Sequence, residues 1–202
     1  RVLKRNTLYC FSPPVMIATF LIEVIGALWV VWRYKLDKVS RLAVATLLFL
    51  AIFQLAEYTI CEGAFGVSSL WWARIGFIAI TFLIPFGIHL ARNMADIRSR
   101  AVDSVVVFGY AAAFSFAAYF LTAPAFTKGM CMGNYVIFVL QSQVSLLYAV
   151  YYWGLLLVGI GTCLFLAREV VKKSHKKALH ALAMGYIAFM LPTVAANIIA
   201  PA

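Results

Sequence analysis

The feature that most constrains the fold is a series of apolar runs, each about 20 residues long. At a rise of about 1.5 Å per residue, a helix of that length crosses a bilayer core about 30 Å thick. The chain is 65% hydrophobic and only 12% charged, whereas soluble domains are about half apolar. We therefore expect an all-α, polytopic transmembrane helix bundle that forms a single domain over residues 1–202. The predicted spans cover residues 12–34, 41–60, 70–91, 104–121, 144–166 and 178–199.

The basic residues are concentrated in alternate turns between these runs. The turns after the first, third and fifth runs hold 12 of the 17 Lys and Arg residues. By the positive-inside rule these turns are cytoplasmic, which puts both termini outside a cytoplasmic (inner) membrane. A formal charge of +10 would suit nucleic-acid binding in a soluble protein. Here membrane topology explains the charge, and no nucleic-acid partner is predicted.

The second run carries a polar stripe. Gln54, Glu57, Tyr58 and Cys61 are spaced i, i+3, i+4 and i+7, so on a helix they fall within an arc of about 100°. An ionisable group in lipid costs about 3 kcal/mol on insertion scales. The stripe is therefore expected to face protein or water.

Glu23 lies at the middle of the first run, among the small residues Thr19, Gly26 and Ala27. Small residues let a second helix approach closely, so the second span is the expected neighbour and Gln54 a candidate hydrogen-bond partner of Glu23. Two interpretations stay open for the cluster of Glu23, Gln54, Glu57 and Tyr58. It is either a proton or solute site, or an interhelical hydrogen bond that fixes the packing.

Three cysteines fall at the predicted external surface, namely Cys10, Cys61 and Cys131. A disulfide between Cys61 or Cys10 and Cys131 would tie a loop to the bundle in an oxidising compartment. The alternative is a soft-metal site, because Met130 and Met132 flank Cys131 and thioether and thiolate ligands suit Cu(I). The disulfide or unremarkable thiols are favoured, and no metal is assigned.

Histidine could ligate haem, but His89, His175 and His180 are isolated from one another in the sequence. We expect each to reach the membrane surface or to bond a carbonyl, and we predict no cofactor. No nucleophile elbow, P-loop or glycine-rich nucleotide fingerprint occurs. The chain is therefore not expected to be an enzyme.

The turn after the fifth run is the most basic. Its cations are Arg168, Lys172, Lys173, Lys176 and Lys177. Such a run attracts anionic lipid by about 1 kcal/mol per basic group near the surface, although topology alone also requires it.

Two local features have structural consequences. Pro85 inside the third run removes a backbone hydrogen bond, so the Thr81 side chain or a neighbouring helix should cover the freed carbonyl. Residues 135–140 in the longest connection are apolar but too short to span, so they should lie at the interface or pack back onto the bundle. Tyr148, Tyr151, Tyr152 and Trp153 are expected near the outer end of the fifth span.

The Cys-Phe-Ser sequence at 10–12, the Gln-x-x-Glu pattern of Gln54 and Glu57, and Pro85 resemble a group of uncharacterised prokaryotic multi-pass membrane proteins. The resemblance covers about the first 90 residues, and it implies that a seventh span belongs to the complete bundle. It implies no activity. The layout of the spans is also similar to the seven-span input modules of bacterial sensor kinases.

These observations favour a non-catalytic membrane protein. It would be an accessory subunit or sensory module whose partners are the lipid bilayer and other membrane proteins, or further copies of itself. The alternative is a small-solute or proton-coupled transporter or channel that uses the Glu and Gln cluster.

Overall fold

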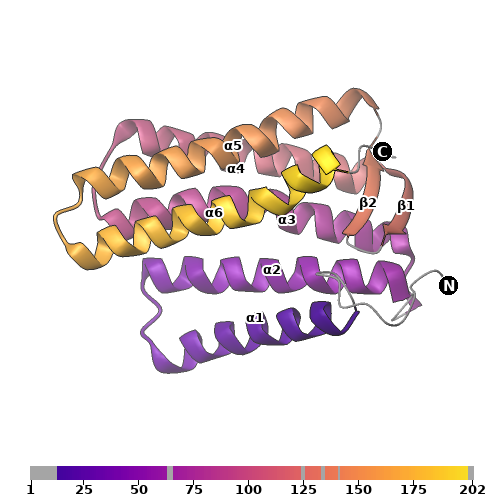
Figure 1. The fold of residues 1–202 in the computed structure, drawn as a ribbon, viewed down its shortest axis with the longest axis horizontal. Coiled ribbons are helices and arrows are strands. Elements are labelled where there is room, and N and C mark those ends of the chain that lie inside the picture. Colours follow the sequence, from indigo (N-terminus) through magenta and orange to yellow (C-terminus); the bar gives the residue numbers. More distant parts are fainter. Residues whose placement is uncertain (1–12, 63–65, 124–125, 133–134, 141, 200–202) are drawn as a thin grey trace.

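The computed structural model describes residues 13–62, 66–123, 126–132, 135–140 and 142–199. Long helices dominate this part of the chain, and one short β-hairpin joins two of them (Figure 1). The helices are α1 (Pro13–Arg33), α2 (Lys38–Glu62), α3 (Ser69–Ala95), α4 (Arg100–Thr122), α5 (Ser142–Glu169) and α6 (Lys173–Ile199). The strands are β1 (Phe126–Met132) and β2 (Tyr135–Leu140). The predicted helical bundle is confirmed.

Successive helices run in opposite directions. The connections after α1, α3 and α5 lie at one end of the bundle, and the hairpin lies at the other end (Figure 1). Most helices extend beyond the predicted spans, because polar residues that flank the apolar runs are also helical. At the start of α6, for example, the helix includes Lys173, five residues before the predicted span.

Five helices are long and apolar enough to cross a membrane. They comprise residues 14–33, 38–60, 69–95, 100–122 and 144–169. The predicted sixth span falls on α6, a helix of 27 residues. The side chains of residues 192–199 lie outside the described part of the chain. A sixth crossing therefore stays a prediction.

The hairpin is the element that the sequence did not lead us to expect. Its strands are antiparallel, with Phe126 opposite Leu140 and Met132 opposite Tyr135. Residues 135–140 are mostly β-branched or aromatic, which suits an extended strand. Phe126 and Leu140 pack against the hydrophobic cluster between α3, α4 and α5. For residues 135–140, two placements were predicted, and at Leu140 the one observed is packing onto the bundle.

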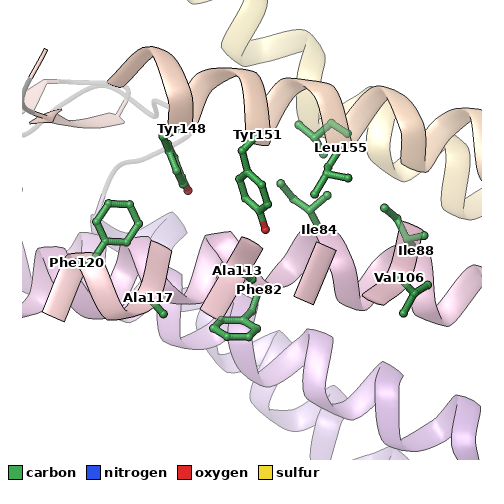
Figure 2. Close-up of a cluster of buried hydrophobic side chains, with 11 residues drawn as sticks. Phe82, Ile84, Ile88, Val106, Ala113, Ala117, Phe120, Tyr148, Tyr151 and Leu155 are labelled. Carbon is green, nitrogen blue, oxygen red and sulfur yellow. The ribbon is translucent and has the colours of Figure 1, made fainter. Parts of the chain in front are cut away.

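The core is built around α3, which packs against α2, α4, α5, α6 and β1. Figure 2 shows its main cluster, where side chains of α3, α4 and α5 interdigitate. A second cluster joins α3 and α4 to α5 and α6 through Ala91, Val102, Cys163 and Leu179. In the main cluster, small residues on α4 allow close packing, since Gly109, Ala113 and Ala117 are all buried.

The first helix is placed differently, because among the described elements α2 is the only one against which α1 packs extensively (Figure 1). Met16 and Ala27 are buried on the side that faces α2. The opposite side is apolar and exposed, and includes Ile22, Ile25 and Trp32. The bundle of α3–α6 therefore has a shared core, whereas α1 and α2 form a hairpin attached to it through α2.

Candidate functional site

Glu57 is the most deeply buried carboxylate in the described part of the chain. It lies on α2, it is 5% exposed, and its Oε2 atom has no hydrogen-bond partner. The Tyr152 side chain of α5 is close enough to interact with it electrostatically. A buried carboxylate oxygen without a partner costs about 1–3 kcal/mol, or more if charged. Glu57 is therefore a position that folding alone does not explain.

Glu23 on α1 has the same property. Its side chain is half-buried, and Oε2 is inaccessible and has no hydrogen-bond partner. One turn later, a Cβ built on Gly26 would lie 3.6 Å from Leu47 of α2, an ordinary van der Waals distance. The predicted approach of the small-residue face of α1 to α2 is thus observed.

The hydrogen bond expected between Glu23 and Gln54 is not among those of the described residues. Since Gly26 is opposite Leu47 in an antiparallel pair, Glu23 lies opposite the turn at residues 50–51. Gln54 is one turn farther along α2. It and Tyr58 are half-buried. The four predicted residues therefore belong to one helical hairpin, but no hydrogen bond joins them.

Arg74, the cation of the third predicted span, does not compensate either carboxylate. Its guanidinium donates to the carbonyl of Leu121 at 2.9 Å and to that of Ala123 at 3.4 Å. It also lies over the Trp71 ring, 4.8 Å from the centroid. Arg74 therefore covers carbonyls at the end of α4.

The polar groups around Pro85 are paired. The Tyr151 hydroxyl donates to the Thr81 carbonyl at 2.9 Å, and the Thr81 and Tyr148 hydroxyls are 2.9 Å apart. The Thr81 carbonyl is the one that Pro85 leaves without an amide donor. The prediction that a neighbouring helix would cover it is confirmed. Tyr148 and Tyr151 are buried among helices (Figure 2). The sequence placed them near the outer end of the fifth span but did not predict that they would be buried.

Tyr186 of α6 lies between two glycines. A Cβ at Gly87 would collide with the Tyr186 hydroxyl, and one at Gly159 would lie 3.2 Å from the ring. The hydroxyl donates to the Ile84 carbonyl at 3.2 Å. These glycines thus admit an aromatic ring between α3 and α5.

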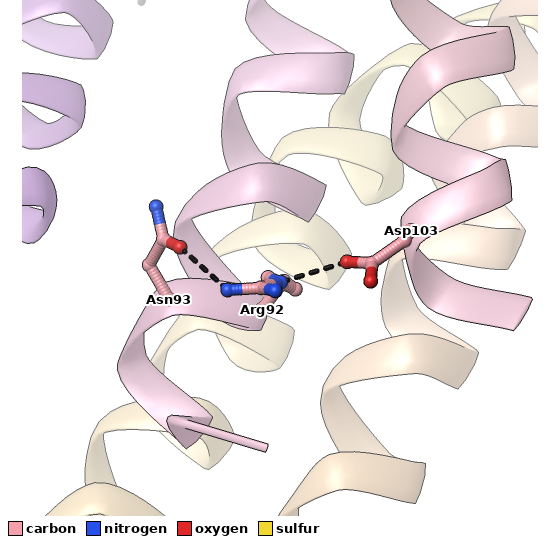
Figure 3. A network of polar contacts seen from close by, with 3 residues as sticks. All are labelled: Arg92, Asn93 and Asp103. Atoms are coloured by element: carbon pink, nitrogen blue, oxygen red, sulfur yellow. Dashed lines mark hydrogen bonds and ion pairs between the residues drawn. The ribbon is translucent and has the colours of Figure 1, made fainter. Parts of the chain in front are cut away.

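A set of polar side chains joins α3 to α4 at the end of the bundle where the connections after α1, α3 and α5 lie. Arg92 pairs with Asp103 at 2.8 Å and donates to the Asn93 side chain at 3.2 Å (Figure 3). His89 Nδ1 is 3.1 Å from the Tyr110 hydroxyl. His89 was expected to bond a carbonyl or reach the surface, and its partner here is a tyrosine. The group is an interhelical tie.

The side chains of the predicted disulfide and soft-metal site lie outside the described part of the chain. Cys10 belongs to residues 1–12, and nothing is described of the side chains of Cys61 or of residues 127–139, which include Met130, Cys131 and Met132. Both interpretations stay predictions. Cys163, the remaining cysteine, is a free buried thiol in the second core cluster. Within the described ranges, no group of three or more His, Cys, Asp or Glu side chains is arranged to hold a metal ion.

The basic run after α5 remains at the surface. Arg168, Lys172, Lys173, Lys176 and Lys177 are all exposed. Lys173, Lys176 and Lys177, together with His180, line a surface depression. The structure thus brings three of the five predicted lipid contacts into one concave patch.

No family model matches the sequence, and no curated protein or solved structure proved significantly similar to the chain. The resemblance based on residues 10–12, Gln54 and Glu57 therefore stays a prediction.

Proposed function

We propose that the chain is an integral protein of the inner membrane whose turns after α1, α3 and α5 face the cytoplasm. Five helices of membrane-spanning length and composition support this proposal. The odd-numbered turns, which carry most of the basic residues, lie at one end of the bundle (Figure 1). A cytoplasmic location for that end satisfies the positive-inside rule.

Within the membrane, the chain acts without catalysis, as an accessory subunit or sensory module that contacts other membrane proteins. The observation that carries this proposal is the one-sided packing of α1. Its outer face is apolar, and it contributes little to the core of the chain. A helix that the core of its own chain does not need is available to a partner helix, which associates in bilayers through close packing.

Purification from native membranes tests this function. A partner should be recovered in fixed stoichiometry with the wild-type chain, and quantitative mass spectrometry would detect it. Ile25→Trp enlarges the outer face of α1 and should reduce recovery of the partner at least fivefold, since a helix contact is sensitive to size but lipid is not.

The matched control is Val107→Trp on α4. Val107 and Ile25 have similar exposed fractions, 68% and 62%. The control should leave recovery unchanged. Recovery of the chain alone, or equal losses in both variants, would contradict the proposed contact.

A second candidate function is proton-coupled or small-solute transport, and Glu57 favours it. An ionisable side chain inside a membrane bundle is a functional candidate by default, and Glu57 has an unpartnered oxygen. Uptake into liposomes that contain the purified protein would test transport. Glu23→Gln and Glu57→Gln should each abolish uptake, and unchanged uptake in both variants would exclude this role.

A further inference from the structure

The surface depression at the start of α6 concentrates uncompensated positive charge. It has a volume of about 400 Å³ and is lined by Lys173, Lys176, Lys177 and His180. None of these lysines forms an ion pair in the part of the chain that the structure describes. The first turn of α6 contains no acidic residue. The His180 ring is fixed at the depression by a 2.7 Å hydrogen bond from Nδ1 to the Lys176 carbonyl.

Two arginines at the same end of the bundle are engaged within the chain. Arg41 donates to the Leu36 carbonyl at 2.9 Å, and Arg92 pairs with Asp103 at 2.8 Å. The positive-inside rule requires basic residues in these turns but does not require that they surround one depression. The grouping at the start of α6 is therefore suited to an anionic occupant.

The same face of α6 becomes apolar immediately beyond the depression. Met184, Ala188 and Leu191 follow His180 at intervals of four, four and three residues, so they continue the row on one side of the helix. All three are exposed. The distance along the helix from His180 to Leu191 is about 16 Å, close to half of a bilayer core about 30 Å thick. A Cβ built on Gly185, beside this row, would meet nothing within 4 Å, so the space next to it is open.

We propose that this face of α6 binds one anionic phospholipid. The phosphate of the headgroup occupies the depression between Lys173, Lys176 and Lys177, and an acyl chain lies along Met184 and Ala188. Charge complementarity accounts for the headgroup, and the length of the apolar row matches one leaflet. The inference rests on the proposed membrane location, but not on the proposed contacts with partner proteins.

The test uses the purified full-length chain in nanodiscs that contain phosphatidylglycerol in a phosphatidylcholine background. A phosphatidylglycerol with a photoactivatable group in its acyl chain should crosslink to α6, at or next to Met184 and Ala188. The combined variant Lys173→Gln, Lys176→Gln and Lys177→Gln should reduce this crosslinking at least tenfold. Phosphatidylcholine with the same photoactivatable chain should give no preferred site.

A charge-matched control removes three exposed cations elsewhere at the same end, by Lys35→Gln, Lys38→Gln and Arg98→Gln. It should leave crosslinking to α6 within twofold of wild type. Ala188→Trp keeps the lysines but places a large ring on the apolar row. It should reduce crosslinking at least threefold, although the positive charge around the headgroup is unchanged.

Three results would overturn the lipid site. The first is an equal loss of crosslinking in the charge-matched control, which would indicate a general surface potential. The second is displacement of the lipid by 20 mM inorganic phosphate, added at constant ionic strength, which would indicate a simple anion site. The third is protein–protein crosslinking through this face without any lipid adduct. In each case, a chain that still inserts into nanodiscs would leave the proposed membrane location standing.

Discussion

The buried carboxylates of the α1–α2 hairpin and the hydroxyls between helices of the α3–α6 bundle differ in their hydrogen bonding. In the bundle, Thr81, Tyr151 and Tyr186 each have a hydrogen-bond partner on another helix. In the hairpin, Glu23 and Glu57 each keep one buried carboxylate oxygen without a partner. Pairing of the first kind stabilises a fold, whereas unpaired buried carboxylates lower stability and persist where they serve another purpose. These hydroxyls of the bundle are therefore structural, and the carboxylates of the α1–α2 hairpin are the candidates for function.

The largest expected effect in the bundle comes from Gly87→Ala. The added Cβ collides with Tyr186, so α6 must move or the ring must leave its place between α3 and α5. Overpacking of this kind costs about 2 kcal/mol of unfolding free energy. Reversible unfolding in mixed micelles would measure it. Gly161→Ala is the control, since nothing lies within 4 Å of its Cβ, and a similar loss there would refute the proposed role of Tyr186.

A smaller loss is expected from Tyr151→Phe. The variant removes the donor to the Thr81 carbonyl, at a cost of about 1 kcal/mol for a hydrogen bond between membrane helices. Pro85→Ala would restore an amide that can reach the same carbonyl. In a double-mutant cycle the cost of Tyr151→Phe should therefore be lower when it is combined with Pro85→Ala than when it is made alone. Additive costs would show that the hydroxyl does not compensate for the proline.

The smallest effect concerns the turn before α2 and depends on pH. The backbone amide of Ser40 donates to Asp37 Oδ1 at 2.7 Å, and this bond, followed by one from the Ser40 hydroxyl, lowers the pKa of Asp37. Because the pKa of Asp37 is lower in the folded chain than in the unfolded chain, ionised Asp37 stabilises the fold. This stability is fully present above the unperturbed Asp pKa of about 3.9, and it is lost as the pH falls through the pKa of Asp37 in the folded chain.

Asp37→Ala should therefore destabilise the α1–α2 hairpin slightly at neutral pH and not at all at pH 2. Asp37→Asn keeps the helix cap but does not titrate, so it should remove the pH dependence alone. Amide exchange in the first turn of α2, measured at both pH values, would check this. Equal exchange rates in wild type and Asp37→Ala at neutral pH would refute the cap.

The sequence predicted the positions of the helices because a run of about 20 apolar residues defines a span by length alone. It also predicted that the Thr81 carbonyl would need a donor, because the effect of Pro85 is local. It did not predict that the Tyr151 hydroxyl would supply this donor, or that the Tyr148 hydroxyl would lie 2.9 Å from the Thr81 hydroxyl. Position along a helix gives the depth of a side chain, but its neighbours depend on how each helix is rotated within the bundle.

The candidate site was predicted in part for the same reason. The pairing of α1 with α2 followed from the small residues around Glu23. The electrostatic interaction of Glu57 with Tyr152 involves α5, which is distant in the sequence, and no spacing indicates it. The β-hairpin was not predicted, because the length of residues 135–140 relative to a membrane only excludes a span, whereas the strand depends on their preference for extended structure.

The comparison between hairpin and bundle is tested most directly by the unfolding free energies of Glu57→Met and Thr81→Val, each measured against wild type in the same micelles. Methionine removes an unpartnered carboxylate and has a similar volume. The free energy of unfolding of Glu57→Met should therefore equal that of wild type or exceed it by up to about 1 kcal/mol. Thr81→Val leaves the buried Tyr148 hydroxyl without this partner and should lose about 1 kcal/mol. A loss of about 1 kcal/mol or more in Glu57→Met would contradict the account, because it would make Glu57 a structural residue like those of the bundle.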